Sequence, residues 1–167
     1  AEFQGAVWTT TVSLPPMTRS QAGVWQAFFM QLHGRSGTFL IGDPDGQSLL
    51  GSLTNTIQVN GDHSVGAFDI SIDGADASTV IFKAGDYVQF GSGASSKLHM
   101  IISDVTSDSS GNATLPVEPP LKSSLSDDAS IVTSSTKAVM RMNSNELGWS
   151  ASRISLYGIS FACTESL

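Results

Sequence analysis

Three histidines and one cysteine are the side chains of this sequence that could bind a transition metal. His33, His63 and His99 lie in different segments, and none has a second histidine or a carboxylate at the spacing that forms a metal-binding face. Cys163 alone cannot form an intrachain disulfide, an iron–sulfur cluster or a thiolate zinc site. We interpret His33 as a residue favoured by a helix C-terminal dipole, His99 as a strand-surface residue and Cys163 as a small apolar strand residue.

Three short segments resemble loops that carry catalysis or ligand binding. Asp43-Pro44-Asp45-Gly46 resembles the start of a calcium loop, but Thr54 stands where such a loop needs a bidentate glutamate. Gly158–Ala162 resembles a nucleophile elbow, but it lies in an apolar strand pattern with no helix after it. Gly91-Ser92-Gly93 lacks the third glycine of a dinucleotide loop and is typical of a hairpin turn. No pair of carboxylates stands out for glycoside hydrolysis.

These patterns predict that the chain is not an enzyme. We expect no catalytic residue, no cofactor-binding residue, no metal ligand and therefore no cofactor. Three tryptophans could still form a platform for stacking on a sugar. Trp25 belongs to a helix face and Trp8 to the inward side of a strand, so Trp149 is the best candidate for an exposed ring.

One segment has the pattern of an amphipathic helix, and we predict a helix over residues 18–33. Thr18 and Gln21 have the spacing of a capping box, and Gly34 fits the residue just after the helix. Apolar residues recur at three- and four-residue spacing, which places them on one face. They are Ala22, Trp25, Phe28, Phe29 and Leu32.

The rest of the chain is typical of β-strands. Residues 6–14 alternate between apolar and polar, and residues 37–43 form a short apolar run. From about residue 52, six strand-like pieces separated by glycine-containing turns follow one another, which indicates a small barrel or sandwich. The pieces are NTIQVNG, AFDISIDG, TVIFKAGDYVQFG, KLHMIISDVTSD, NATLPVEPPL and ASIVTS. After residue 135, strand patterns return in KAVMRMN and RISLYGISFACTE.

We therefore predict a mainly β fold, with a β-sandwich or split-barrel frame, one covering helix and an inserted small β-barrel. The frame would comprise residues 1–51 plus 134–167, and the inserted barrel residues 52–133. The alternative is one continuous barrel with a helix at its rim.

Composition excludes several classes of function. The 167 residues carry 8 basic and 15 acidic side chains, a net charge of −7, which argues against binding to a nucleic-acid backbone. No apolar run approaches the roughly 18 residues of a membrane-spanning helix, so we expect no membrane partner. Charged residues make up only 14% of the chain, which suits surfaces that become buried between subunits. Because the chain begins at Ala1 and not at a methionine, we expect that an upstream segment has been removed or lies outside this sequence.

Several stretches resemble a family of bacteriophage tail-tip proteins from phages with long non-contractile tails. The stretches are LPPMTRSQAGVW, FFMQLHGRSGTFLIGDP, FKAGDYVQF, KLHMIISDVTSDSSGNATLPVEPP and the closing ISFACTE. Each motif is of low complexity, so the resemblance depends on their order and spacing, which extend over nearly the whole chain. The family includes distal tail proteins and neighbouring minor tail proteins of the baseplate region.

The resemblance implies a structural virion protein rather than an enzyme. We expect a homo-oligomeric ring, a hexamer, that joins the tail tube protein to the tail hub or tip proteins. The frame would make the lateral contacts and line the lumen, while the inserted barrel would project outward. The expected location is the tail of the virion, after assembly in the cytoplasm of the bacterial host. A net negative charge would suit a lumen through which DNA slides. The alternative function is a carbohydrate- or receptor-binding β-module of the tail tip.

Overall fold

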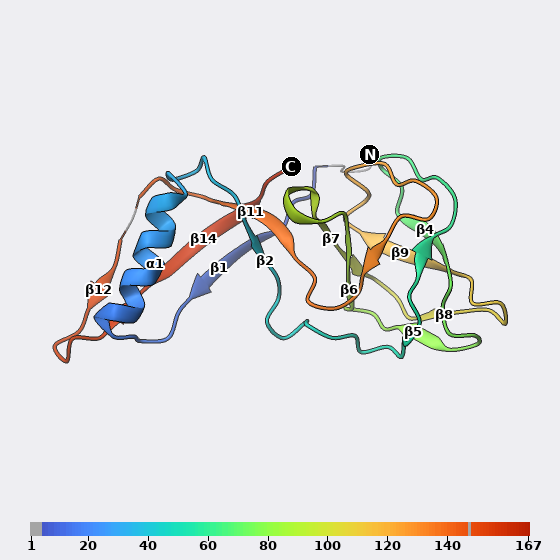
Figure 1. Cartoon of the computed structure of the whole chain (residues 1–167), viewed down its shortest axis with the longest axis horizontal. Helices are drawn as coiled ribbons and strands as arrows, with labels where there is room; N and C mark the ends of the chain where they lie inside the picture. The colour runs from blue at the N-terminus through green and yellow to red at the C-terminus, as the bar shows by residue number, and fades with distance from the viewer. Residues whose placement is uncertain (1–4, 147) are drawn as a thin grey trace. The chain divides into compact units, whose positions relative to one another are not determined.

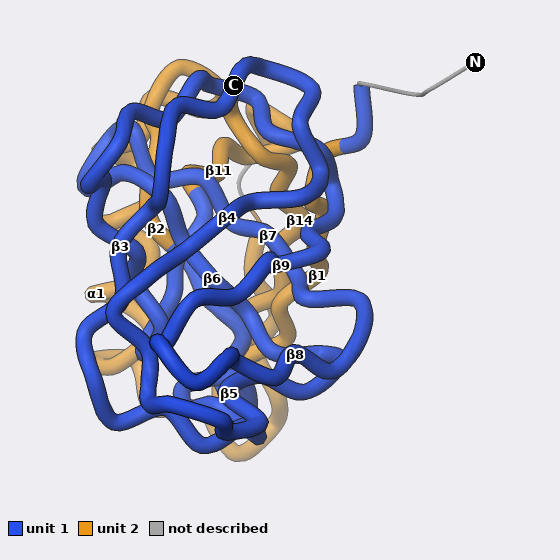
Figure 2. Tube along the Cα trace, turned by 90° about the vertical axis from the view of Figure 1, so that its right-hand side faces the viewer, with its two compact units in different colours: residues 1–6, 41–138 blue, residues 7–40, 139–167 orange. Residues whose placement is uncertain are grey.

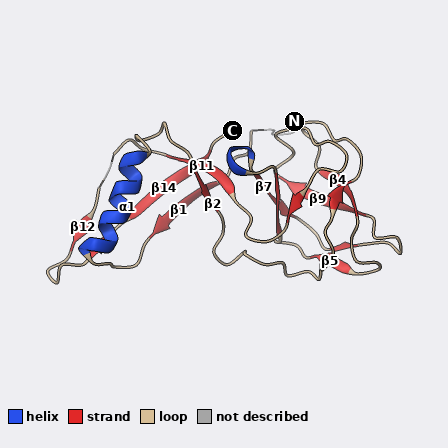
Figure 3. Cartoon of the chain, viewed as in Figure 1, coloured by secondary structure: helices blue, strands red, loops and turns tan. Residues whose placement is uncertain are grey.

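The computed structural model describes residues 5–146 and 148–167, and it is mainly β, as the sequence predicts. The described residues contain one α-helix, and the remaining regular structure is short strands and one 3₁₀ turn, Gly93–Ser95 (Figure 3). The chain divides into two compact units (Figure 2). Unit 1 comprises residues 41–138 with the short segment before Val7, and unit 2 comprises Val7–Leu40 and Val139–Leu167.

Unit 2 is a four-stranded sheet covered by the helix. The sheet has the order β1 (Thr9–Ser13), β14 (Ser160–Glu165), β11 (Ala138–Met142) and β2 (Phe39–Ile41). The chain leaves this sheet through β2 and returns through β11, and these two strands are neighbours. An inserted unit whose two ends lie on adjacent strands can be accommodated without disturbing the sheet.

Helix α1 (Arg19–Gln31) lies beside β14 (Figure 1), and its aromatic side chains contact Phe161 of that strand. The ring of Phe29 lies 5.0 Å from that of Phe161, and Trp25 lies 6.3 Å from the same ring. Ala22, Phe29 and Leu32 are buried, as the spacing predicts. Trp25 and Phe28, on the same face, are partly buried.

The ends of α1 differ in detail from the predicted helix at 18–33. Thr18 is the N-cap, and the Gln21 side-chain oxygen accepts its backbone N–H at 3.0 Å, which is one half of the predicted capping box. The C-cap is Leu32, and His33 follows with φ +51°, so the left-handed turn begins one residue before Gly34. The helix therefore ends earlier than predicted. The Gly37 N–H closes the turn after the helix by donating to the Leu32 carbonyl at 2.7 Å.

A short two-stranded ribbon completes unit 2. It consists of β12 (Ser150–Ala151) and β13 (Tyr157–Gly158). Tyr157 also exchanges two backbone hydrogen bonds with Met17, at 2.8 and 3.1 Å, which attaches the ribbon to the chain just before α1.

Unit 1 is a small, nearly closed antiparallel barrel. Its sheet has six strands. A β-bridge between Gln58 and Ser130 joins the two ends of the sheet, because Gln58 lies in the strand at one end and Ser130 directly precedes the strand at the other end. In sheet order the strands are β10 (Ile131–Val132), β6 (Tyr87–Phe90), β7 (Lys97–Ile101), β9 (Ala113–Glu118), β4 (Asp69–Asp73) and β3 (Gln58–Val59). A separate ribbon pairs β5 (Val80–Phe82) with β8 (Val105–Thr106).

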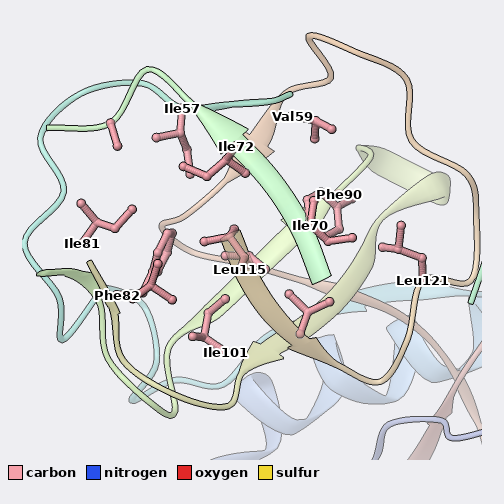
Figure 4. Close-up of a cluster of buried hydrophobic side chains, with 14 residues drawn as sticks. Ile57, Val59, Ile70, Ile72, Ile81, Phe82, Phe90, Ile101, Leu115 and Leu121 are labelled. Atoms are coloured by element: carbon pink, nitrogen blue, oxygen red, sulfur yellow. The ribbon is translucent and has the colours of Figure 1, made fainter. Parts of the chain in front are cut away.

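Alternate residues of these strands form the core of unit 1 (Figure 4). On β4, Ile70 and Ile72 are fully buried, while their neighbours in sequence are not. Leu115 on β9 and Phe82 on β5 are also fully buried. The alternation holds on β4 but not on β5, where Ile81 and Phe82 are both fully buried. TVIFKAGDYVQFG and KLHMIISDVTSD each contain two strands rather than one.

The unit boundaries lie outside the predicted ones at 51/52 and 133/134. Residues 41–51 and 134–138 belong to unit 1 because their backbone groups are bonded there. The Ser135 N–H donates to the Gln47 carbonyl at 2.8 Å, and the Lys137 N–H donates to the Gln89 side-chain oxygen at 2.8 Å. These bonds come from loops, so a period in the sequence does not reveal them.

Candidate functional site

The three histidines have different surroundings in the structure. The His63 ring bonds to the Gly61 carbonyl at 3.0 Å and to the Ser71 N–H at 3.1 Å, so it braces a loop of the barrel. His33 is exposed directly after α1. Among the residues that the structure describes, no group of three or more histidine, cysteine, aspartate or glutamate side chains could hold a metal ion.

The interpretation of His99 as a surface residue is wrong. Its side chain is fully buried, its Nδ1 lies 2.6 Å from the Pro119 carbonyl, and its ring lies 5.4 Å from that of Phe90. Strand β7 is covered on both faces at this position, since Leu98 on the opposite face is also buried. Alternation alone therefore could not identify an exposed side.

The segments that resemble ligand loops have structural roles. The Asp43 carboxylate accepts the Tyr87 hydroxyl at 2.9 Å and the Asp45 N–H at 3.0 Å, which closes the turn. A Cβ on Gly46 would lie 2.6 Å from the Tyr87 ring, so glycine lets this ring cover the turn. Gly158–Ala162 lies along β13 and β14 in extended strand rather than at a strand-to-helix elbow. Burial raises the pKa of the Cys163 thiol.

The four-stranded sheet of unit 2 has two edge strands, β1 and β2, and β1 is the longer of the two. The Glu165 N–H donates to the Trp8 carbonyl at 2.8 Å, and the Leu14 N–H donates to the Ile159 carbonyl at 2.9 Å. Bonded positions recur every second residue in an antiparallel ladder, so the N–H and C=O groups of Thr9, Thr11 and Ser13 point away from β14. In the described part of the chain, no strand pairs with β1 on that side.

This β1 edge, Thr9–Ser13, lacks the usual features that prevent pairing between edges. Its sequence TTTVS contains no charge, no proline and no glycine, and its register against β14 is continuous over five residues. Natural edge strands usually carry a lysine, a proline or a bulge that discourages a further strand. The β1 edge can therefore accept the strand of another chain by main-chain hydrogen bonding.

The outer face of α1 is also free of charge after its first residue. Val24 is 71% exposed and Met30 is 60% exposed. The first turn carries no acidic residue and the last turn no basic residue. An isolated surface helix normally presents charged side chains to water, so this face has the composition of a surface that another chain covers.

Acidic and basic residues divide unequally between the units. All eleven aspartates lie within residues 41–138, and all four arginines lie outside them. Residues 41–138 contain twelve acidic and four basic side chains, a net charge of −8, whereas residues 7–40 and 139–167 contain two acidic and four basic, a net charge of +2. The net negative charge of the chain is therefore a property of the barrel.

No protein-family model matches the chain, and a search of characterised proteins finds no significant match. Within the residues that the structure describes, no helix combines the length and apolar character needed to cross a bilayer.

Proposed function

We propose that the chain is a structural subunit of a phage tail tip, of the distal tail or neighbouring minor tail protein type. In this proposal it assembles with copies of itself into a closed ring, a hexamer, that joins the tail tube to the tip proteins. The observation that carries the proposal is the unprotected β1 edge of unit 2, because a ring subunit needs a repeated surface that its neighbour can pair with. The order of the motifs in the sequence, which resembles that of tail-tip proteins, supports a phage tail as the assembly.

The motifs that carry the resemblance contain two aspartates whose side chains form structural hydrogen bonds. The aspartate of FKAGD, Asp86, is 3% exposed and accepts backbone N–H groups from Leu50, Gly51 and Lys83. The aspartate that ends GTFLIGD, Asp43, bonds to Tyr87. These two aspartates therefore connect loops and turns of unit 1 to each other.

The insertion of unit 1 between β2 and β11 also supports the proposal. The insertion joins β2 and β11, at the end of the sheet order opposite β1, so the connection to unit 1 does not interrupt β1 or its pairing with β14. The charge argument for a negative lumen does not extend to unit 2, because its net charge is +2 and the aspartates belong to unit 1. The assignment of the frame to the lumen therefore depends on the family resemblance and not on net charge.

The test is the mass of the purified protein in solution, measured by light scattering and by sedimentation, with electron microscopy of any oligomer. We expect a closed ring with the mass of six chains of 17.5 kDa. A protein that stays monomeric at high concentration contradicts the ring and favours the alternative function, a carbohydrate- or receptor-binding module.

A charge on the β1 edge tests the lateral contact itself. Thr11→Lys adds a solvated cation beside the outward N–H and C=O groups, and we expect it to dissociate the oligomer without unfolding the subunit. Thr106→Lys is the matched control, because Thr106 is an exposed strand residue of unit 1. An oligomer that survives Thr11→Lys but not Thr106→Lys would assign the contact to the barrel instead.

A further inference from the structure

An open pocket of about 510 Å³ lies in unit 2 beside the only tryptophan with a largely exposed ring among the described residues. Trp149 is 61% exposed, whereas Trp8 and Trp25 are partly buried. The pocket lies between the end of β11, the start of β14 and the β12–β13 ribbon. Its volume falls within the range of roughly 300–1,000 Å³ that is typical of small-molecule sites.

The pocket combines an apolar floor with a polar rim. Met142 and Phe161, which are 6% and 8% exposed, contribute apolar surface at its base. The exposed rim carries an indole, an amide, a carboxylate and three hydroxyl groups, from Trp149, Asn143, Glu146, Ser144, Ser150 and Ser160.

Local hydrogen bonds orient part of this rim. The Thr164 hydroxyl donates to Asn143 Oδ1 at 2.5 Å. This bond fixes the orientation of the amide, and its NH₂ group is then the part of Asn143 that would donate to a ligand. The Ser144 hydroxyl accepts the Glu146 N–H at 2.9 Å, which holds the chain that carries the carboxylate. A Cβ on Gly158 would lie 2.8 Å from Ser150 Oγ, so the glycine keeps this wall of the pocket thin.

We propose that this pocket binds a neutral saccharide. A pyranose ring has an apolar C–H face that can lie on the indole of Trp149, and hydroxyl groups around its edge that both donate and accept. The amide of Asn143 and the hydroxyls of the rim supply donors, and the Glu146 carboxylate accepts two hydrogen bonds from a pair of sugar hydroxyls.

Charge narrows the ligand class. Glu146 is the only formally charged side chain among the residues that line the pocket, and no arginine or lysine lies among them. An anionic sugar, such as a uronic acid or a phosphorylated unit, would therefore meet a carboxylate without a compensating cation. This site is independent of the proposed ring, since every lining residue belongs to one unit of one chain.

The experiment titrates the full chain with N-acetylglucosamine, glucose, galactose and mannose, each by saturation-transfer NMR and by tryptophan fluorescence. Glucuronic acid serves as the anionic comparison. We expect saturable binding of at least one neutral sugar and no tighter binding of glucuronic acid. Trp149→Ala should weaken binding about tenfold, since stacking and lost contact area together are worth about 1.4 kcal/mol. Glu146→Gln should weaken it several-fold.

Ile154→Ala is the matched control. Ile154 lies in the loop between β12 and β13, is 75% exposed and does not line this pocket. The substitution of Ile154 by alanine should therefore leave sugar binding unchanged. Trp149→Phe keeps an aromatic face and should retain intermediate affinity, which separates stacking from misfolding. Absence of binding for all four neutral sugars, equal affinity in Trp149→Ala, or tighter binding of glucuronic acid would each overturn the proposal. The oligomeric mass tests the ring separately, whatever the sugar result.

Discussion

The Asp86 carboxylate accepts the backbone N–H of Leu50 at 2.6 Å, across a separation of 36 residues. The same carboxylate accepts Gly51 N–H at 3.1 Å and Lys83 N–H at 2.8 Å. It thereby binds the loop that follows β2 to the turn between β5 and β6. A Cβ on Gly51 would lie 2.2 Å from the Ile81 carbonyl oxygen, so the loop lies directly against the backbone of β5.

Asp86→Ala should lower the free energy of unfolding of unit 1 by about 3 kcal/mol, because it leaves three partly buried N–H groups without their acceptor. Urea unfolding followed by far-UV circular dichroism measures this. Tryptophan fluorescence should change little, since Trp8, Trp25 and Trp149 all belong to unit 2. Asp45→Ala is the control, because it removes a carboxylate from an exposed turn of the same unit. Equal effects of the two substitutions would contradict the role given to Asp86.

Phe29→Ala should destabilise unit 2 by about 3–5 kcal/mol, because its side chain is 7% exposed and contacts Phe161 in a packed cluster. Phe28→Ala should cost less, about 1–3 kcal/mol, since Phe28 is only partly buried. Urea unfolding followed by tryptophan fluorescence compares the two variants directly. A larger loss for Phe28 than for Phe29 would show that the helix face is rotated from its position here.

Asp76 should contribute a measurable part of the acid sensitivity of unit 1. Its pKa is lowered from 3.8 to about 2, first by the Thr54 hydroxyl and then by the N–H groups of Thr54 and Asn55 at 2.7 and 3.1 Å. Between these two pH values the unfolded chain binds more protons at this carboxyl than the folded chain, so acidification favours unfolding. The contribution is complete above about pH 4 and is lost as the pH falls through about 2.

Asp76→Asn should therefore flatten the dependence of the unfolding midpoint on pH between about 4 and 2. The measurement is thermal unfolding at closely spaced pH values, with Asp45→Asn as the charge-matched control in an exposed turn. A slope that stays the same in Asp76→Asn would mean that other carboxyls account for the acid sensitivity.

Gly23→Ala should stabilise unit 2 by about 0.5–1 kcal/mol. Gly23 lies inside α1, and a Cβ built on it meets no atom within 4 Å. Alanine is therefore accommodated and loses less conformational entropy than glycine when the helix forms. Thermal unfolding followed by tryptophan fluorescence measures the gain. A loss of stability would show that another chain approaches the helix at this residue.

The strands and the helix could be predicted locally because their signals are local. Ile70 and Ile72 alternate with polar neighbours on one strand, and Phe29 and Leu32 recur at helical spacing. The buried face of this strand and that of the helix can therefore be identified from the sequence alone. The bulk of the mainly β fold, including the inserted barrel, follows from such patterns.

The tertiary structure decided what depends on contacts between distant segments. His99 is buried because strands on both sides and the Pro119 carbonyl surround it, and no period of 2 shows which faces of β7 are covered. The unit boundaries depend on loop hydrogen bonds such as that between Leu50 and Asp86. The pocket beside Trp149 and the open edge at Thr11 exist only because sheet order sets which strand is last and which segments converge. Residue types limit what a surface can do, but long-range pairing determines which residues form that surface.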